Sequence, residues 1–169
     1  MAISMYQASV PTITRALTNL IGVLEKGAAH CEARKIDPAV MVASRLYPDM
    51  FPLVKQVQIA SDVSKIGTAR LAGVEFPKYD DNEATFADLV QRLRKTIDYL
   101  KTFKPEQIDG AESRTIKFTA GGTDYAQPGN EYLFTRMLPN VFFHCATAYD
   151  ILRHNGVEIG KGDFLGKVS

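Results

Sequence analysis

Apolar residues recur at steps of three and four along four long segments of this chain, and this spacing constrains the fold more than any other feature. In the first segment they are Ile3, Tyr6, Val10, Ile13, Leu17, Leu20, Ile21 and Leu24. The spacing predicts an amphipathic helix over residues 3–29, in which Pro11 marks a kink or the start of the regular part. Residues 30–48 contain two X-Pro pairs and are predicted to be a long connection with one short turn of helix.

The same periodicity predicts two helices in the middle of the chain. The second helix is expected to begin with Asp49 as its N-cap and to stop at Gly73. The third is expected to run from Phe86 until Lys104-Pro105. The segment between them contains the acidic run 80–83, which we expect to be a solvated loop that caps the third helix.

Residues 115–125 differ in kind from the helical segments. They alternate polar and apolar side chains around Gly121-Gly122, which predicts a small β-hairpin. The last helix is predicted to run from near Asn130 to His154, with Pro139 as a kink, and an irregular strap is expected to follow it. Together these elements predict an all-α, up-down four-helix bundle with a small β-hairpin before the last helix, in a single domain over residues 1–169.

Composition and charge exclude several classes of function. The chain has 20 basic and 19 acidic residues and a net charge of +1, so it lacks the one-signed field that a nucleic-acid partner requires. Its apolar runs are far shorter than the roughly 20 residues of a membrane span. The N-terminus does not resemble a secretory signal. We therefore expect a soluble, cytoplasmic protein with Cys31 and Cys145 as free thiols.

The C-terminal part of the chain resembles the last helix of the DinB/YfiT-like superfamily. In that superfamily a metal-binding histidine is followed nine residues later by the arginine of a Leu-Arg pair and then by Gly-Val. His144, Leu152-Arg153 and Gly156-Val157 match this spacing. Residues 48–51 and 160–166 are similar to one uncharacterised branch, catalogued as a domain of unknown function. The resemblance covers nearly the whole chain and implies a DinB/YfiT-like bundle.

The superfamily's metal ligands are largely absent from this chain. The resemblance implies three histidines, two of them four residues apart on the last helix and one on the second helix. Here the position four before His144 is Asn140, and Gln56 or Gln58 stands in the second helix. On a regular helix His154 lies roughly 15 Å along the axis from His144 and about 80° around it. Because one imidazole with two amides binds transition metals poorly, no metal or cofactor is expected, with zinc or nickel as the alternative.

His144 should point into the bundle, and two interpretations stay open. It is either a neutral core histidine, hydrogen-bonded to Asn140, Gln56 or a tyrosine hydroxyl, or a general acid or base in a small pocket. The candidate ligand-binding residues are Asn140, Gln56, Gln58 and Tyr149. A pocket that reaches His144 would favour a binder or an enzyme. A core histidine would be sealed by Phe142, Phe143 and Leu53.

These observations predict a metal-free homodimer that binds an unknown small molecule in a degenerate metal site around His144. The resemblance implies a dimer, because members of the superfamily commonly dimerise, and the first and last helices are rich in apolar residues. The alternative is an enzyme that uses His144 as general acid or base, with or without a divalent metal. By analogy with the superfamily's thiol-dependent members, it would be a transferase or an isomerase.

Overall fold

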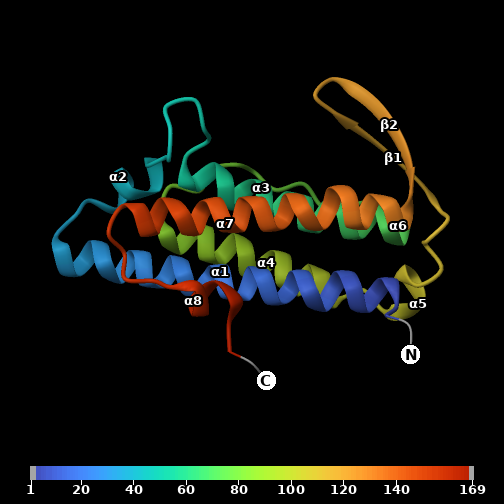
Figure 1. Cartoon of the computed structure of the whole chain (residues 1–169), viewed down its shortest axis with the longest axis horizontal. Coiled ribbons are helices and arrows are strands. Elements are labelled where there is room, and N and C mark those ends of the chain that lie inside the picture. Colours follow the sequence, from blue (N-terminus) through green and yellow to red (C-terminus); the bar gives the residue numbers. More distant parts are fainter. Residues whose placement is uncertain (1–2, 168–169) are drawn as a thin grey trace.

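Four long helices form the bundle of this computed structural model, which describes residues 3–167 (Figure 1). They are α1 (Met5–Arg34), α3 (Leu53–Ala72), α4 (Phe86–Lys101) and α7 (Leu138–His154). Shorter elements join them: α2 (Pro38–Ala43), α5 (Pro105–Ile108), β1 (Thr115–Ala120), β2 (Thr123–Pro128), α6 (Gly129–Tyr132), the π-helical turn η1 (Leu133–Met137) and α8 (Lys161–Leu165). The predicted class, a helical bundle with a hairpin before the last helix, is confirmed.

The four helices do not simply alternate in direction. Gln56, near the start of α3, contacts His144, whereas Gly67, later in α3, lies against Met137, which precedes α7, so α3 and α7 are antiparallel. In contrast, α3 and α4 run the same way, and α1 and α7 run together in the opposite direction (Figure 1). The observed order is therefore up, down, down, up, a refinement of the plain up-down order predicted.

The segment over residues 73–85 makes this order attainable. A 20-residue helix such as α3 is about 30 Å long, because each residue adds about 1.5 Å. Thirteen residues of extended chain span up to about 43 Å. The segment has no helix or strand of its own, and it runs back along the bundle to the start of α4 (Figure 1).

Two helix boundaries differ from the prediction. The first helix continues past residue 29 to Arg34, because Cys31 extends the buried stripe, and Lys35 ends it in the left-handed conformation with φ 55°. Asp49 is not the N-cap of α3. Pro52 is the N-cap and disfavours helical geometry in the residue before it, and the first N–H of α3, that of Leu53, donates to the carbonyl of Ser44 at 2.9 Å. The stop at Gly73, with φ 71°, is as predicted.

Pro139 distorts the last helix in a specific way. A proline inside a helix removes one N–H and crowds the preceding turn. The chain accommodates it with η1, which ends two residues before Pro139, so the single helix predicted from Asn130 is α6, η1 and α7 in succession. Such π-helical turns are frequently found at functional sites.

The hairpin projects from the α6 end of the bundle, whereas the tail lies along α1 (Figure 1). In the hairpin β1 pairs antiparallel with β2, with Phe118 opposite Tyr125. The tail contains α8, a short helix absent from the predicted strap, and Asn19 of α1 donates to the carbonyl of Phe164 at 3.0 Å. Buried residues of all four long helices form the hydrophobic core. Among residues 3–167, no helix combines the length and the apolar character needed to cross a membrane.

Candidate functional site

His144 lies in the interface of α3 and α7, where its side chain is 9% exposed. Its Nδ1 is 2.6 Å from Oε1 of Gln56, and the amide nitrogen of Gln56 donates to the carbonyl of Phe51 at 3.0 Å. Because the bond to Phe51 orients the amide, Oε1 faces the imidazole and accepts its hydrogen. The neutral ring is therefore held with the proton on Nδ1.

The other ring nitrogen of His144 remains available. Burial lowers the pKa of His144 below its ordinary value, which favours the neutral imidazole at pH 7. Its Nε2 has no hydrogen-bond partner among residues 3–167, and the fully buried side-chain atoms without a partner in that range are Thr14 Oγ1 and Gln127 Oε1. Nε2 therefore keeps contact with solvent and presents a lone pair, which can accept a hydrogen bond or a proton.

The residues expected to seal His144 enclose it only in part. Leu53 is fully buried, and the Phe143 ring packs edge-on against the imidazole with centroids 5.2 Å apart, although Phe143 itself is 56% exposed. Phe142 instead lines a groove of about 250 Å³ formed with α1 and α8.

A cavity of about 290 Å³ lies one helical turn along α7 from His144, between α3, η1 and β1. Its lining joins polar and aromatic side chains from elements far apart in the sequence: Asp62, Val63, Ile66, Arg70, Phe118, Thr119, Ala120, Tyr132, Arg136, Met137 and Asn140. Asn140 is the candidate residue that this cavity contains, and His144 is not part of the lining.

The remaining candidate residues lie elsewhere. Gln58 is buried, but it donates to Glu83 of the 73–85 segment at 2.8 Å. Tyr149 packs against Phe164 of α8, with ring centroids 6.1 Å apart. The structure therefore brings Gln56 to His144 and Asn140 to the neighbouring cavity, and it separates Gln58 and Tyr149 from both.

The donor set around His144 does not fit the metal site that the superfamily implies. Among residues 3–167, no three side chains of His, Cys, Asp or Glu lie close enough together to hold a metal ion. Both polar atoms of the Gln56 amide are engaged, by His144 and by Phe51. Transition-metal sites in proteins use three or four such ligands, so a lone imidazole cannot replace them.

Cys145, beside His144 in the sequence, is not a nucleophile in this fold. Its side chain is buried, and burial raises the pKa of the thiol to about 12. The thiolate is the reactive form, and at pH 7 it is effectively absent.

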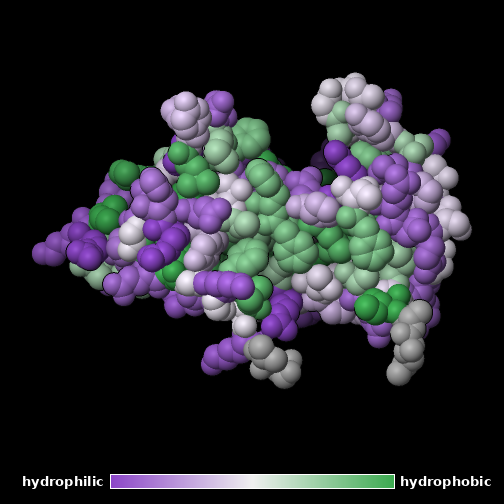
Figure 2. Space-filling view, in the orientation of Figure 1, coloured by the Kyte–Doolittle hydropathy of each residue, from purple (hydrophilic) through white to green (hydrophobic). Residues whose placement is uncertain are grey.

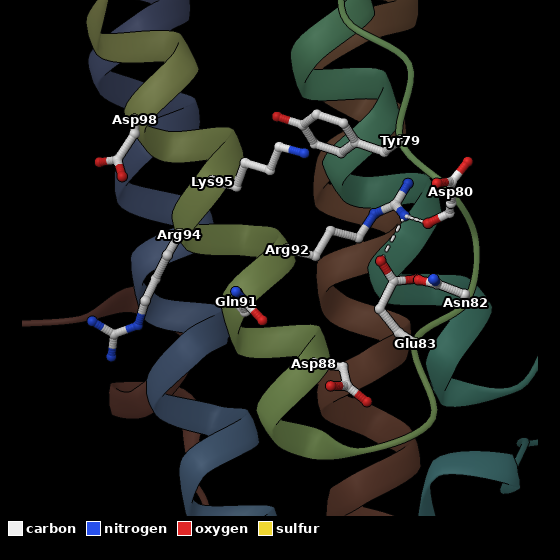
Figure 3. Close-up of a pocket in the computed structure, with 10 residues that line it drawn as sticks. All are labelled: Tyr79, Asp80, Asn82, Glu83, Asp88, Gln91, Arg92, Arg94, Lys95 and Asp98. Carbon is white, nitrogen blue, oxygen red and sulfur yellow. Dashed lines mark hydrogen bonds and ion pairs between the residues drawn. The ribbon is translucent and has the colours of Figure 1, made fainter.

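A second polar cluster is centred on Arg92 of α4, and Figure 3 shows Arg92 with two of its contacts, Asp80 and Glu83. We call it the Arg92 cluster: Arg92, Lys65, Lys55, Asp62, Asp81 and Glu83. The Arg92 side chain is 2% exposed and pairs with Asp62 at 2.9 Å, Asp81 at 3.1 Å and Glu83 at 2.9 Å. Lys65 pairs with Asp62, and Lys55 pairs with Asp81.

The Arg92 cluster fastens the 73–85 segment to α3 and α4. Arg92 also donates to the carbonyl of Asp80, and the Lys65 Nζ lies 3.7 Å from the centroid of the Tyr79 ring. Asp81 and Glu83 are therefore ion-paired rather than simply solvated, and the capping of α4 is done by Thr85 and Asp88. The sequence signal for this cluster is Arg92 itself, a charged residue in the apolar stripe of its helix.

Comparison with known proteins finds a matching family model and a similar solved structure. The family model described as a domain of unknown function, DUF1993, matches residues 5–165. A crystal structure of a DinB family member protein from Shewanella denitrificans is 40% identical in sequence and superposes with a TM-score of 0.88. The similarity covers 96% of this chain and 92% of that one. No curated protein matches the chain.

Proposed function

This chain belongs to the DUF1993 family of DinB-like domains of unknown function, and from that premise we propose that it is a metal-free homodimer that binds a small molecule beside His144. The observation that carries the proposal is the arrangement of the imidazole. Gln56 holds the Nδ1 proton, and Nε2 offers a lone pair to a ligand N–H or O–H group.

The region around His144 supplies more than one polar contact. Asn140 precedes His144 by one helical turn and lines the adjacent cavity of about 290 Å³. Binding pockets are typically about 300–1,000 Å³ with a few convergent polar groups, so this cavity lies at the small end of the range. A ligand that contacts both residues would be a small, polar molecule.

A ligand-observed NMR screen of small polar metabolites against the wild type and two variants tests this site. His144→Asn removes the Nε2 acceptor, and His154→Asn changes the same residue type at the exposed end of α7. We expect hits that bind the wild type and His154→Asn equally well and bind His144→Asn about two- to tenfold more weakly, since one hydrogen bond contributes roughly 0.5–1.5 kcal/mol. Equal binding to all three proteins would contradict the proposal.

The absence of a bound metal is tested on untagged protein purified without chelator. We expect inductively coupled plasma mass spectrometry to find well under one zinc, nickel or iron per chain, because the donor set around His144 lacks three ligands. A near-stoichiometric metal would show that this part of the proposal is wrong.

The homodimer is supported by the apolar groove of α1, α7 and α8. Hydrophobic side chains gather along this face of the molecule (Figure 2). Phe142 and Leu165 line the groove and are 37% and 51% exposed. We expect a dimer by light scattering at micromolar concentration, a monomer for Phe142→Glu and no change for Val40→Glu on exposed α2. A monomeric wild type would overturn this part.

The cytoplasm is the proposed location. Both cysteines, Cys31 and Cys145, are unpaired and buried, as in proteins of reducing compartments. Fractionation of the source cells tests this, and recovery in a secreted or membrane fraction would contradict it.

General acid-base catalysis by His144 is the second candidate function. It is favoured by the same geometry, because a neutral imidazole with its Nδ1 proton held by Gln56 is oriented to accept a proton at Nε2. Turnover of a screened hit that depends on His144, with a pH profile that follows its lowered pKa, would favour the enzyme over the binder.

A further inference from the structure

Two guanidinium groups from different elements converge on one aromatic ring. Cζ of Arg70, on α3, lies 6.0 Å from the centroid of Phe118, and Cζ of Arg136, in η1, lies 5.4 Å from it. Tyr125 stacks on one face of the same ring, with centroids 5.4 Å apart and 18° between the planes. Both arginines and Phe118 line the 290 Å³ cavity.

These two charges are not balanced from within the protein. Neither arginine forms an ion pair in the part of the chain that the structure describes. Asp62 is the acidic residue that lines the cavity, and it is already paired with Lys65 at 3.0 Å and Arg92 at 2.9 Å. Arg70 is partly buried and Arg136 is exposed, and like charges in one lining repel each other, so an anion bound between them would relieve that repulsion.

The positive potential extends into an adjoining cavity of about 490 Å³ under the hairpin, which also contains Arg70. Lys117 adds a further positive charge there. The acidic residue in this lining, Asp124, accepts a hydrogen bond from the Thr119 hydroxyl at 2.6 Å. The two cavities together therefore hold more positive than negative charge.

Hydrogen-bond donors accompany the charges. Arg70 donates to the hydroxyl of Tyr132 at 3.2 Å, so the hydroxyl hydrogen remains free to donate to a ligand. Tyr132 is 5% exposed, and the amide of Asn140 completes the polar lining. Guanidinium forks match the geometry of carboxylate and phosphate oxygens and bind them in pairs of hydrogen bonds.

We propose that this cavity binds an oxyanion group, a carboxylate or a phosphate, between Arg70 and Arg136. This inference rests on the proposed function: the small molecule proposed to bind near His144 would place its charged group between Arg70 and Arg136. The ligand class is thus a small anionic metabolite rather than a neutral one.

Titration of the folded protein with inorganic phosphate, and separately with succinate, at constant ionic strength tests the site. The comparison uses Arg70→Gln, Arg136→Gln and the control Arg94→Gln, which removes the same charge from an exposed arginine of α4. We expect calorimetry to show one site, with affinity at least about tenfold lower in the first two variants and unchanged in the control. Binding of either anion with this pattern supports the inference and identifies the oxyanion.

Two results would overturn it. One is binding of neither anion to the wild type, and the other is equal affinity in the wild type and in folded Arg70→Gln and Arg136→Gln. If a variant fails to fold, NMR of the wild-type arginine side chains decides. Anion-induced shifts at Arg70 and Arg136 but not at Arg94 support the site, and shifts spread over surface arginines contradict it.

His144→Asn separates this inference from the proposed function. If phosphate or succinate binds this variant as it binds the wild type while the arginine variants lose affinity, the anion site stands whether or not the metabolite screen finds a ligand at His144. If the screen finds neutral ligands that depend on His144 while neither anion binds, the proposed function stands and the anion site is wrong.

Discussion

Two polar regions that adjoin at Asp62 of α3 differ in how their charges are balanced. On the α4 side, the Arg92 cluster pairs a buried arginine with three carboxylates. On the α7 side, His144 has one partner and a free ring nitrogen, and Arg70 and Arg136 have no carboxylate partner among residues 3–167. The charges of the first region are paired within the protein, whereas the second region keeps a ring nitrogen and two guanidinium groups that can bind a ligand.

The difference indicates different roles. The partners of Arg92 lie on α3 and on the 73–85 segment, so the cluster fixes the course of the chain that makes α4 parallel to α3. Removing one partner of a buried ion pair is strongly destabilising, so fully paired buried charges are structural. Their hydrogen-bonding groups are already used and are not available to a ligand. Unpaired polar groups beside a cavity contribute less to the fold and can bind a partner from solution.

The largest expected effect is on the paired side. Arg92→Met leaves Glu83 without its cation, and removing one partner of a buried ion pair destabilises by about 3–5 kcal/mol. The control is Arg94→Met, two residues away, whose pair with Glu25 is exposed and contributes about 0–1 kcal/mol. Urea unfolding measures both. Equal losses would show that the cluster is not structural.

A smaller loss of stability is expected when either of two buried glutamines of α3 is replaced, Gln56 beside His144 or Gln58 beside Glu83. Gln56→Leu leaves the Nδ1 proton of His144 and the carbonyl of Phe51 unpaired, which costs about 1–3 kcal/mol. Gln58→Leu should cost less, since Glu83 retains Arg92. Urea unfolding of the two variants tests the order, and a larger loss for Gln58→Leu would contradict it.

The pH dependence of stability is expected to change with His144. Its folded pKa lies below the unfolded value of 6.5, so the unfolded chain binds the proton more tightly. The free energy of unfolding should therefore fall as the pH drops below about 6.5 and level off below the folded pKa. His144→Asn should remove this component and His154→Asn should keep it. Chemical denaturation between pH 5 and 8 checks this, and identical curves for the wild type and His144→Asn would refute it.

The smallest effect is expected at Arg136. Because Arg136 has no carboxylate partner among residues 3–167 and lines the same cavity as Arg70, Arg136→Gln should change stability by no more than about 0.5 kcal/mol, in the stabilising direction. Thermal unfolding with and without added salt measures it, and salt should narrow the difference between wild type and variant. A loss above about 1 kcal/mol would mean that Arg136 is part of the structural framework after all.

Much of the secondary structure could be predicted from local pattern. The apolar stripes of the four long helices, the stop at Gly73 and the hairpin around residues 121–122 all depend on neighbours within a few residues. The predicted start of α3 is wrong, because the backbone restriction that Pro52 imposes outweighs the capping preference of Asp49. In the candidate site, local pattern leaves Asn140, Gln56 and a tyrosine hydroxyl as possible partners of His144, and it gives no signal for Arg70 or Arg136.

The sequence by itself determined which segments become helices and which faces of them are apolar, because these follow from the spacing of side chains along one element. Only the tertiary structure decided that α4 runs parallel to α3, and that His144 meets Gln56 rather than Gln58. The same is true of Arg70 and Arg136, which meet at Phe118. These outcomes depend on contacts between residues far apart in the chain. Residues 73–85 determine how α4 lies along α3, and the π-helical turn before Pro139 determines how α7 lies along α3.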